Sequence, residues 1–281
     1  MSPHWFLVDW DCCVGAGGEG EVFVGRSLGT WELCAVKVSV CIQREEARQQ
    51  LSRELDRWMR AAHGGDEGIV GLVAWNLDAP RPFLVFEFAH AGSLADEMRE
   101  MRRQGRVYHP ARALERVREV LVSLAHVHAR GVIHRDVKPG NLLRFGTALK
   151  LTDFGTGQSL ARSVALQTEA FVGTRAYAAP EQLQGEPVDD RSDLFAVGCI
   201  LHEMLTGTPA KPTSGPRALG RYPNVLVLPE LHELLAGLLA EDKWRRPATA
   251  ADAIRRVDAV LAMYSQARQV WQGLRLGPSP Y

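Results

Sequence analysis

The stretch His134-Arg135-Asp136-Val137-Lys138-Pro139-Gly140-Asn141 decides how this chain of 281 residues is interpreted. Asp153-Phe154-Gly155 follows, and its aspartate comes 12 residues after Asn141. Together the two motifs supply an aspartate that can act as a base, a lysine charge and two oxygen ligands suited to Mg²⁺. Because phosphoryl transfer requires a base, a charge clamp and metal ligands, the two motifs predict that chemistry.

The length of the chain is sufficient for a large buried core, and its charge argues against some classes of binding partner. Lys+Arg and Asp+Glu both number 33, so the formal net charge is zero, which argues against a general nucleic-acid or membrane-surface binder. The five cysteines show no Cys-x-x-Cys spacing and indicate a reduced protein rather than a disulfide or zinc framework. The sequence has no signal-peptide pattern and no apolar run near the ~20 residues of a membrane helix. We therefore expect a soluble, cytoplasmic chain with no membrane span.

Hydrophobic patterning changes near residue 90. Before it, short apolar runs alternate with turn residues and predict strands at Glu21–Gly25, Leu33–Ile42 and Phe83–Phe88. One helix is expected among them, at about Gln43–Ala62. After residue 90 the pattern is mostly helical, with helices predicted at Pro110–Ala129, Asp190–Thr206, Glu230–Ala240 and from about Ala248 towards Trp271. A strand-rich front and a helical back predict an α+β chain of two lobes, joined near His90–Ser93.

Gly15, Gly17 and Gly20 form the pattern Gly-x-Gly-x-x-Gly. Closely spaced glycines let the backbone approach phosphates where a Cβ would clash. Dinucleotide-binding folds use the same spacing, but there the pattern runs directly into a helix. Here Glu21–Gly25 continues as a predicted strand, which favours a phosphate-binding loop between two strands. A merely structural turn is the alternative interpretation of the motif taken alone.

Lys37 lies in the β-branched context Ala35-Val36-Lys37-Val38. A lysine there could simply extend to solvent from an edge strand. In a phosphate-binding cleft it would instead contact the α- and β-phosphates and be held by a carboxylate. Glu54, on the predicted helix, is the candidate partner, since the acids at the start of that helix lie too close to the strand. A solvated helix face is the alternative for Glu54, because arginines flank it.

Taken in order, five motifs resemble those of eukaryotic-type protein kinases, with a pattern most like the bacterial serine/threonine kinases. They are the glycine loop, Ala35-Val36-Lys37, His134-Arg135-Asp136, Asp153-Phe154-Gly155 and Ala179-Pro180-Glu181. The resemblance implies an α+β, two-lobed protein-kinase fold, with a small antiparallel sheet and one main helix in the N-lobe and a larger, mainly helical C-lobe. The implied bounds are a kinase domain at 1–265 (N-lobe 1–86, hinge 87–92, C-lobe 93–265) and a helical extension or tail at 266–281.

The resemblance implies chemical roles for the motif residues. Asp136 would orient and deprotonate the attacking hydroxyl, and Lys138 would neutralise charge on the transferred group. Asn141 and Asp153 would bind the Mg²⁺, or Mn²⁺ in its place, that accompanies ATP. The residues expected to bind ATP are Gly15, Ala16, Gly17, Gly18, Gly20, Val22, Ala35, Lys37, Glu54, Phe86, Glu87, Ala89 and Leu143. Adenine is expected beside the hinge, with hydrogen bonds to the backbones of Glu87 and Ala89, Val22 and Ala35 above it, Leu143 below it and Phe86 behind it.

Other residues match architectural and regulatory positions of the family. Glu181 and Arg246 match an ion pair that ties the activation segment to the helical lobe. Asp193 matches the residue that holds the catalytic loop, and Thr174 is expected to bond to the catalytic Asp and Lys. Thr168 is the expected phosphate acceptor, with Ser163 second, because a phosphate there could satisfy the cation of Arg135. Glu169 could instead neutralise that arginine without modification.

We therefore expect transfer of the γ-phosphoryl group of ATP to serine and threonine hydroxyls of protein substrates, including autophosphorylation of the activation segment. Two alternatives stay open. A pseudokinase scaffold is disfavoured because Lys37, Asp136, Asn141 and Asp153 are all present. A small-molecule phosphotransferase of the aminoglycoside-kinase type is disfavoured by the Ala-Pro-Glu motif, since those enzymes generally lack it.

Several segments depart from the family pattern. Glu19 places an acid at the tip of the glycine loop. The segment 207–224 is short and interrupted by prolines and glycines. The family normally places a substrate-docking helix there, so we expect this helix to be truncated or missing. A run of arginines (Arg99, Arg102, Arg103, Arg106) is expected to be a solvated helix face, and otherwise a site for an acidic partner. Trp271 and Leu274 are expected to pack on the helical lobe.

Bacterial relatives usually continue through a membrane helix into a sensor domain. This chain stops after the kinase lobe, so it resembles a soluble version or an excised domain. A homodimer is a family-level expectation without support from particular residues.

Overall fold

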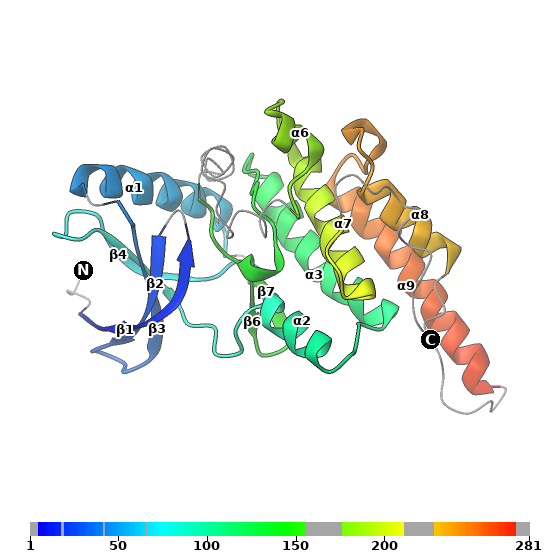
Figure 1. Ribbon diagram of the computed structural model, residues 1–281, viewed down its shortest axis with the longest axis horizontal. Coiled ribbons are helices and arrows are strands. Elements are labelled where there is room, and N and C mark those ends of the chain that lie inside the picture. The colour runs from blue at the N-terminus through cyan, green and yellow to red at the C-terminus, as the bar shows by residue number, and fades with distance from the viewer. Residues whose placement is uncertain are drawn as a thin grey trace.

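The computed structural model describes residues 5–17, 20–41, 43–65, 67–155, 176–210 and 228–273. Figure 1 shows the strand-rich N-terminal part, in blue, at one end of the molecule and the main helices at the other. The predicted α+β architecture of two lobes is confirmed. The predictions for Gly18, Glu19, Ser163, Thr168, Glu169, Thr174 and Leu274, the Trp271 side chain, and residues 211–224 lie outside the described part.

The N-lobe contains a five-stranded antiparallel sheet with the order β1-β2-β3-β5-β4. Its strands are β1 (Phe6–Gly17), β2 (Gly20–Ser27), β3 (Leu33–Val38), β4 (Leu72–Asn76) and β5 (Phe83–Glu87). The strand predicted at 33–42 ends already at Val38, and the one predicted at 83–88 ends at Glu87.

Helix α1 (Arg44–Ala61) covers one face of this sheet, in close agreement with the predicted helix. Successive side chains of a strand point to opposite faces. Val36 and Val85 pack in the cluster on one face, whereas Leu84 and Phe86 pack with Leu51 and other residues of α1 on the other. Lys37 pairs with Leu84 across the strands and lies on the α1 face. This alternation aims the lysine at the helix.

The C-lobe is built from helices around one large core, with a smaller cluster of Ala179, Phe195, Cys199 and Ala210 apart from it. Its elements are α2 (Leu94–Arg103), α3 (Pro110–His128), η1 (Pro139–Asn141), β6 (Leu142–Phe145), β7 (Ala148–Leu151), α6 (Pro180–Gln184), α7 (Asp190–Thr206), α8 (Pro229–Leu238), η3 (Lys243–Arg245) and α9 (Ala250–Gly273). The β6–β7 hairpin lies between the N-lobe and the large helices (Figure 1). It precedes the Asp153 motif directly and therefore brings that motif to the junction of the lobes.

Helix α7 is the central element of this core. The Asp189 side chain accepts a hydrogen bond from the Arg191 amide at its start, and Gly207 adopts a φ of 73° just past its end. The helix contacts α3, α8 and α9, and nearly all of its residues are buried. A sequence that is apolar nearly all round predicts such burial, and the predicted bounds agree with the structure. Among the described residues no helix is both long and apolar enough to cross a membrane.

Candidate active site

Lys37 connects the two lobes at the candidate site. Its ammonium nitrogen lies 2.7 Å from Glu54 Oε1, on α1, and 2.7 Å from Asp153 Oδ1, after β7. The Lys37 and Glu54 side chains are 9% and 3% exposed. The structure therefore brings together the lysine and the carboxylate that the sequence paired, and it adds Asp153 as a second partner.

The charges of this cluster support one another. Burial lowers the pKa of Lys37, but the charges of Asp153 and Glu54 outweigh it and hold the pKa above its ordinary value. Burial raises the pKa of Asp153, but the adjacent Lys37 cation outweighs it and the pKa is lowered. Burial raises the pKa of Glu54 more than Lys37 lowers it. The two carboxylates therefore hold Lys37 as a cation at the junction of the lobes.

Asp136, Lys138 and Asn141 form a second cluster in the catalytic-loop motif. Lys138 Nζ lies 2.7 Å from Asp136 Oδ2. The amide nitrogen of Asn141 donates to the Asp136 carbonyl at 2.8 Å and to Oδ2 at 3.1 Å. One carboxylate oxygen of Asp136 is therefore held by two donors. Because Nδ2 of Asn141 is used in these bonds, its side-chain oxygen faces away from them.

The backbone of this loop is fixed from below by Asp193, at the start of α7. Asp193 is 1% exposed and accepts hydrogen bonds from the backbone amides of His134 (2.9 Å) and Arg135 (2.8 Å), and it lies 2.8 Å from His128 Nε2. Arg135 has a positive φ of 69°, which a non-glycine residue adopts at some cost. The two hydrogen bonds from the loop to one buried carboxylate hold this conformation.

The Asp153 motif is held from both sides. Asp153 itself has a φ of 66°. His134 Nε2 lies 2.9 Å from the Thr152 carbonyl, and the Phe154 ring lies 5.0 Å from the His134 ring in the C-lobe core. Arg57 of α1 donates to the Gly155 carbonyl at 2.7 Å. The motif is thereby tied both to the catalytic loop and to the helix that carries Glu54.

The glycine-rich segment forms the β1–β2 hairpin, as the predicted strand context required. Gly15 pairs with Val22, and Gly17 with Gly20. A Cβ built on Gly20 would lie 2.6 Å from the Val38 carbonyl and 3.3 Å from Lys37 Cε, so no other residue fits without displacing β3. A Cβ on Gly15 would meet only ordinary contacts. Gly20 is therefore required by strand packing beside Lys37, a reason that the motif alone does not reveal.

The residues predicted around adenine lie at the junction of the lobes. Ala35 and Leu143 pack against the cluster that contains buried Phe86, and Val22 pairs with Lys37 on the neighbouring strand. The Glu87 amide donates to the Gly71 carbonyl at 2.9 Å, and the Ala89 carbonyl accepts from the Gly92 amide at 3.1 Å. These two backbone groups are thus already paired within the chain.

The architectural pair predicted in the C-lobe is present. Arg246 Nη1 and Nη2 lie 2.7 and 2.9 Å from the two carboxylate oxygens of Glu181, and both side chains are buried. Ser192 donates to the same carboxylate at 2.5 Å. Burial raises the pKa of Glu181, but the hydrogen bonds from Arg246 and Ser192 outweigh it and lower the pKa. Next to it, Gln182 donates to the Arg135 carbonyl at 2.9 Å and links this corner to the catalytic loop.

The four arginines of the run are exposed, as predicted, and one of them also reaches a buried acid. Arg99 and Arg103 make exposed pairs with acids one turn away, as the predicted solvated face requires. Arg102, however, contacts buried Glu203 of α7 at 3.1 Å, and Tyr177 donates to the same carboxylate. This network was missed because its partners are about a hundred residues apart and no local pattern joins them.

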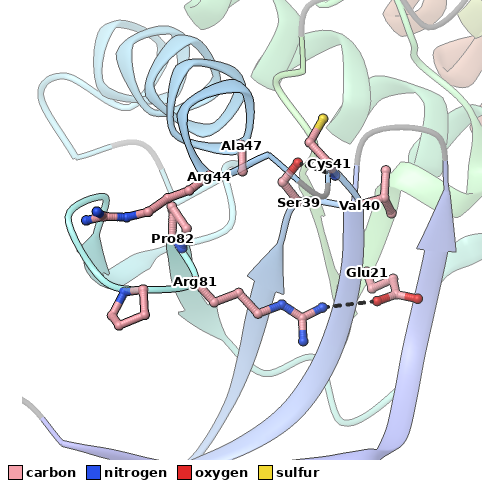
Figure 2. A pocket seen from close by; sticks show the side chains of 9 residues that line it. Glu21, Ser39, Val40, Cys41, Arg44, Ala47, Arg81 and Pro82 are labelled. Atoms are coloured by element: carbon pink, nitrogen blue, oxygen red, sulfur yellow. Dashed lines mark hydrogen bonds and ion pairs between the residues drawn. The ribbon is translucent and has the colours of Figure 1, made fainter.

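A cavity of about 360 Å³ lies away from this site, where the end of β3 meets the start of α1. Figure 2 shows Arg81 reaching across it to Glu21, with Ser39 and Cys41 on the β3–α1 connection and Arg44 on α1. Arg81 also lies over the Trp10 ring at 4.9 Å. One acid and two arginines line it, and Arg81 donates to Glu21 while Arg44 donates to the Ala79 carbonyl.

Comparison with known proteins identifies the family of the chain. The protein kinase domain family matches residues 11–256. Serine/threonine-protein kinase PknB of Mycolicibacterium smegmatis is 32% identical over 280 residues, covering 90% of this chain and 42% of that protein. PknB of Mycobacterium tuberculosis is 35% identical over 210 residues, 70% of this chain and 32% of that protein. A probable PknB of Corynebacterium glutamicum is 32% identical over 205 residues, 71% of this chain and 31% of that protein. The chain thus spans less than half the length of these relatives. It belongs to the protein kinase family, and its relatives are bacterial serine/threonine kinases.

Proposed function

We propose that this chain transfers the γ-phosphoryl group of ATP to serine or threonine hydroxyls of proteins. The observation that carries the proposal is the pair of 2.7 Å contacts from Lys37 to Glu54 and Asp153, which joins two motifs and helix α1 in one site between the lobes. Kinase chemistry requires such a lysine and a metal-binding aspartate to be in place together. A chain that only kept the fold would not need this cluster intact.

The donor set fits a magnesium ion. Mg²⁺ prefers oxygen ligands and neutralises phosphate charge when it is bound. Asn141 uses its amide nitrogen on Asp136, which orients its side-chain oxygen for a metal. Asp153 uses one carboxylate oxygen on Lys37, and its lowered pKa keeps it ionised at neutral pH. Asn141 and Asp153 are therefore the residues that we assign to the metal.

Asp136 is the residue that we assign to the acceptor hydroxyl. Its Oδ2 is held by Lys138 and Asn141, which fixes the carboxylate in one orientation. A fixed carboxylate can align the hydroxyl and accept its proton as the oxygen attacks phosphorus. Lys138, whose ammonium lies 2.7 Å from this carboxylate, would neutralise part of the negative charge on the transferred group.

We assign the nucleotide to the junction of the lobes. Phosphates would lie under the β1–β2 hairpin and against Lys37, and adenine would lie between Val22 and Ala35 on one side and Leu143 on the other. The Glu87 carbonyl and the Ala89 amide are the hinge groups assigned to adenine, because the Glu87 amide and the Ala89 carbonyl are paired inside the chain. Phe86 closes the back of the pocket.

Related bacterial kinases and the resemblance of the activation segment support proteins as substrates over small molecules. We further propose a signalling role in the cytoplasm, autophosphorylation at Thr168 or Ser163, and the domain bounds given by the resemblance. Homodimer formation and the identity of the substrate proteins stay predictions at the level of the family.

Nucleotide binding tests the assignment separately from turnover. Displacement of a fluorescent ATP analogue by ATP, with and without Mg²⁺, should show tighter binding with the metal. Asp153→Asn should remove most of that metal-dependent gain, whereas Asp56→Asn, an exposed α1 control, should retain it. A native chain that binds ATP no better with Mg²⁺, or an Asp153→Asn chain that keeps the full gain, would contradict the proposed site.

A further inference from the structure

The β6–β7 hairpin of the C-lobe contacts both ends of the hinge through two basic residues. In its register Leu143 lies opposite Lys150, and Arg144 lies opposite Leu149. Lys150 and Arg144 point to different ends of residues 87–92. The hairpin also carries Leu143, the residue assigned below adenine, and leads into the Asp153 motif.

Lys150 holds the first end of the hinge through Glu87. Its ammonium nitrogen lies 2.7 Å from Glu87 Oε1, and the same oxygen accepts a hydrogen bond from the Gly71 amide at 2.6 Å. The Glu87 amide donates back to the Gly71 carbonyl. The Lys150 and Glu87 side chains are 20% and 31% exposed, so the ion pair is partly shielded from solvent. A Cβ on Gly71 would lie 3.3 Å from this carboxylate.

Arg144 holds the other end through the backbone. Its guanidinium donates to the Ala91 carbonyl at 3.1 Å, and its amide donates to the Gly92 carbonyl at 2.8 Å. Its Nε lies 2.9 Å from Glu97 of α2. Arg144 therefore anchors the end of the hinge at residues 91–92 through several contacts. At the other end, the hairpin makes one charged contact with the hinge, the ion pair of Lys150 with Glu87.

We propose that Lys150 is a positioning residue for the nucleotide, acting through Glu87. The inference rests on the proposed function and deepens it. The ion pair ties the end of β5, whose backbone is assigned to adenine, to the hairpin that carries the floor residue Leu143. It therefore sets the separation and orientation of the two surfaces that hold the base.

Loss of the ion pair should affect binding more than chemistry. Without the Lys150 cation the Glu87 carboxylate keeps, among the described residues, the Gly71 amide as its side-chain partner, and solvation would draw it outward. The hinge would then adopt more conformations, and ordering it when ATP binds would cost free energy and weaken the affinity. Asp136 and the catalytic loop are anchored independently by Asp193, so the transfer step should be little changed.

Three variants test this inference: Lys150→Met, Glu87→Gln and the double variant. We expect the dissociation constant of ATP, from displacement of a fluorescent analogue, and the KM for ATP to rise about threefold to tenfold in each single variant, with kcat within about twofold of native. The double variant should bind ATP no more weakly than the weaker-binding single variant, because all three variants lose the same ion pair. Lys150→Arg should keep near-native binding, since an arginine can also reach the carboxylate and lie over the Phe145 ring, where the Lys150 ammonium is 4.5 Å from the ring centroid.

Arg118→Met is the matched control. It breaks an ion pair with Asp258 (2.6 Å) on the far side of the C-lobe and should leave the dissociation constant unchanged. Native-like ATP binding by Lys150→Met would overturn the inference, as would a fall in kcat at an unchanged dissociation constant, or an effect of Arg118→Met equal to that of Lys150→Met. A native chain that binds no ATP would overturn the proposed function, and this inference with it.

Discussion

Glu54 of α1 lies 2.7 Å from the Lys37 ammonium of β3, and both side chains are buried. The same ammonium contacts Asp153, so the position of one N-lobe helix is linked to a residue assigned to the metal. Arg57, one turn after Glu54, also contacts the Asp153 motif through the Gly155 carbonyl. Helix α1 thus helps to position Lys37 and the Asp153 motif through two of its side chains, Glu54 and Arg57.

Substitution of Glu54 should reduce activity without removing it. In Glu54→Gln the lysine keeps Asp153 as a partner, but its position is less well determined, so we expect kcat/KM for ATP to fall about 10- to 100-fold. In Lys37→Met the cation itself is lost, and the fall should be about 100- to 1000-fold. Steady-state phosphorylation measures both. Glu45→Gln, on the exposed face of α1, is the control, and Glu54→Gln with native kcat/KM would refute the role of the pair.

The pair of His128 and Asp193 predicts a pH dependence of stability. Burial lowers the pKa of His128, but its hydrogen bond to Asp193 and the charges of Asp193 and Asp190 outweigh burial and raise the pKa. A raised histidine pKa gives stabilisation that is fully present below the unfolded value of about 6.5 and is lost as the pH rises through the folded value. For Asp193, burial raises the pKa, but the His128 bond and nearby positive charges outweigh it and lower the pKa. Its contribution is therefore lost as the pH falls from about 4.

His128→Gln should show this dependence directly. The native chain should melt at a higher temperature than the variant at about pH 6, and the difference should shrink towards about pH 9. Thermal unfolding followed by circular dichroism over this range measures the difference. His63→Gln, at an exposed position, should follow the native curve throughout. A native-to-variant difference that stays constant with pH would show that protonation of His128 is not involved.

The buried pair of Glu181 and Arg246 should be costly to break from one side. Arg246→Met leaves the Glu181 carboxylate buried without its cation, so we expect a loss of about 3–5 kcal/mol in the free energy of unfolding. Arg246→Lys should not restore it, because one ammonium cannot replace the two parallel hydrogen bonds. Urea denaturation gives the values.

The exposed pair of Arg118 and Asp258 serves as the comparison, and breaking it should cost about 1 kcal/mol or less. The double variant Glu181→Leu with Arg246→Met should lose less than Arg246→Met alone, since no unpaired charge remains. Equal losses for the buried and the exposed pair would contradict this account.

Phe86 should determine how large a nucleotide can bind. It is 8% exposed and packs with Leu51, Leu55 and Val70 behind the proposed adenine site. Phe86→Ala should open that wall, at a cost of about 3–5 kcal/mol in stability, and should accept N6-benzyl-ATP, which we expect the native chain to exclude. Phe88→Ala, two positions along, should not accept it. Use of the bulky nucleotide by the native chain would place adenine elsewhere.

Much of the fold and most of the candidate site follow from local sequence. Helix α7 was predicted with its observed bounds because it is apolar nearly all round. Lys37 was paired with Glu54 because the acids at the start of the predicted helix lie too close to the strand to reach back. The motif residues Asp136, Asn141 and Asp153 were found because phosphoryl transfer restricts which residue types can occur together.

What sequence did not predict depends on contacts between distant segments. The β6–β7 hairpin was missed because its strands are four residues each and carry Arg144 and Lys150 in place of an apolar pattern. The partners of these residues are set by how the hairpin meets the hinge, which no local pattern encodes. The contact between Arg102 and Glu203 was missed for the same reason.

The most direct test of the central claim is incubation with γ-labelled ATP and Mg²⁺, followed by phosphosite mapping, with Asp136→Asn as the control. The native chain should label serine or threonine residues, with Thr168 or Ser163 first, and the variant should lose about 100-fold or more of that activity while still binding ATP. No label on a native chain that binds ATP, or equal labelling of the native and Asp136→Asn chains, would contradict the account.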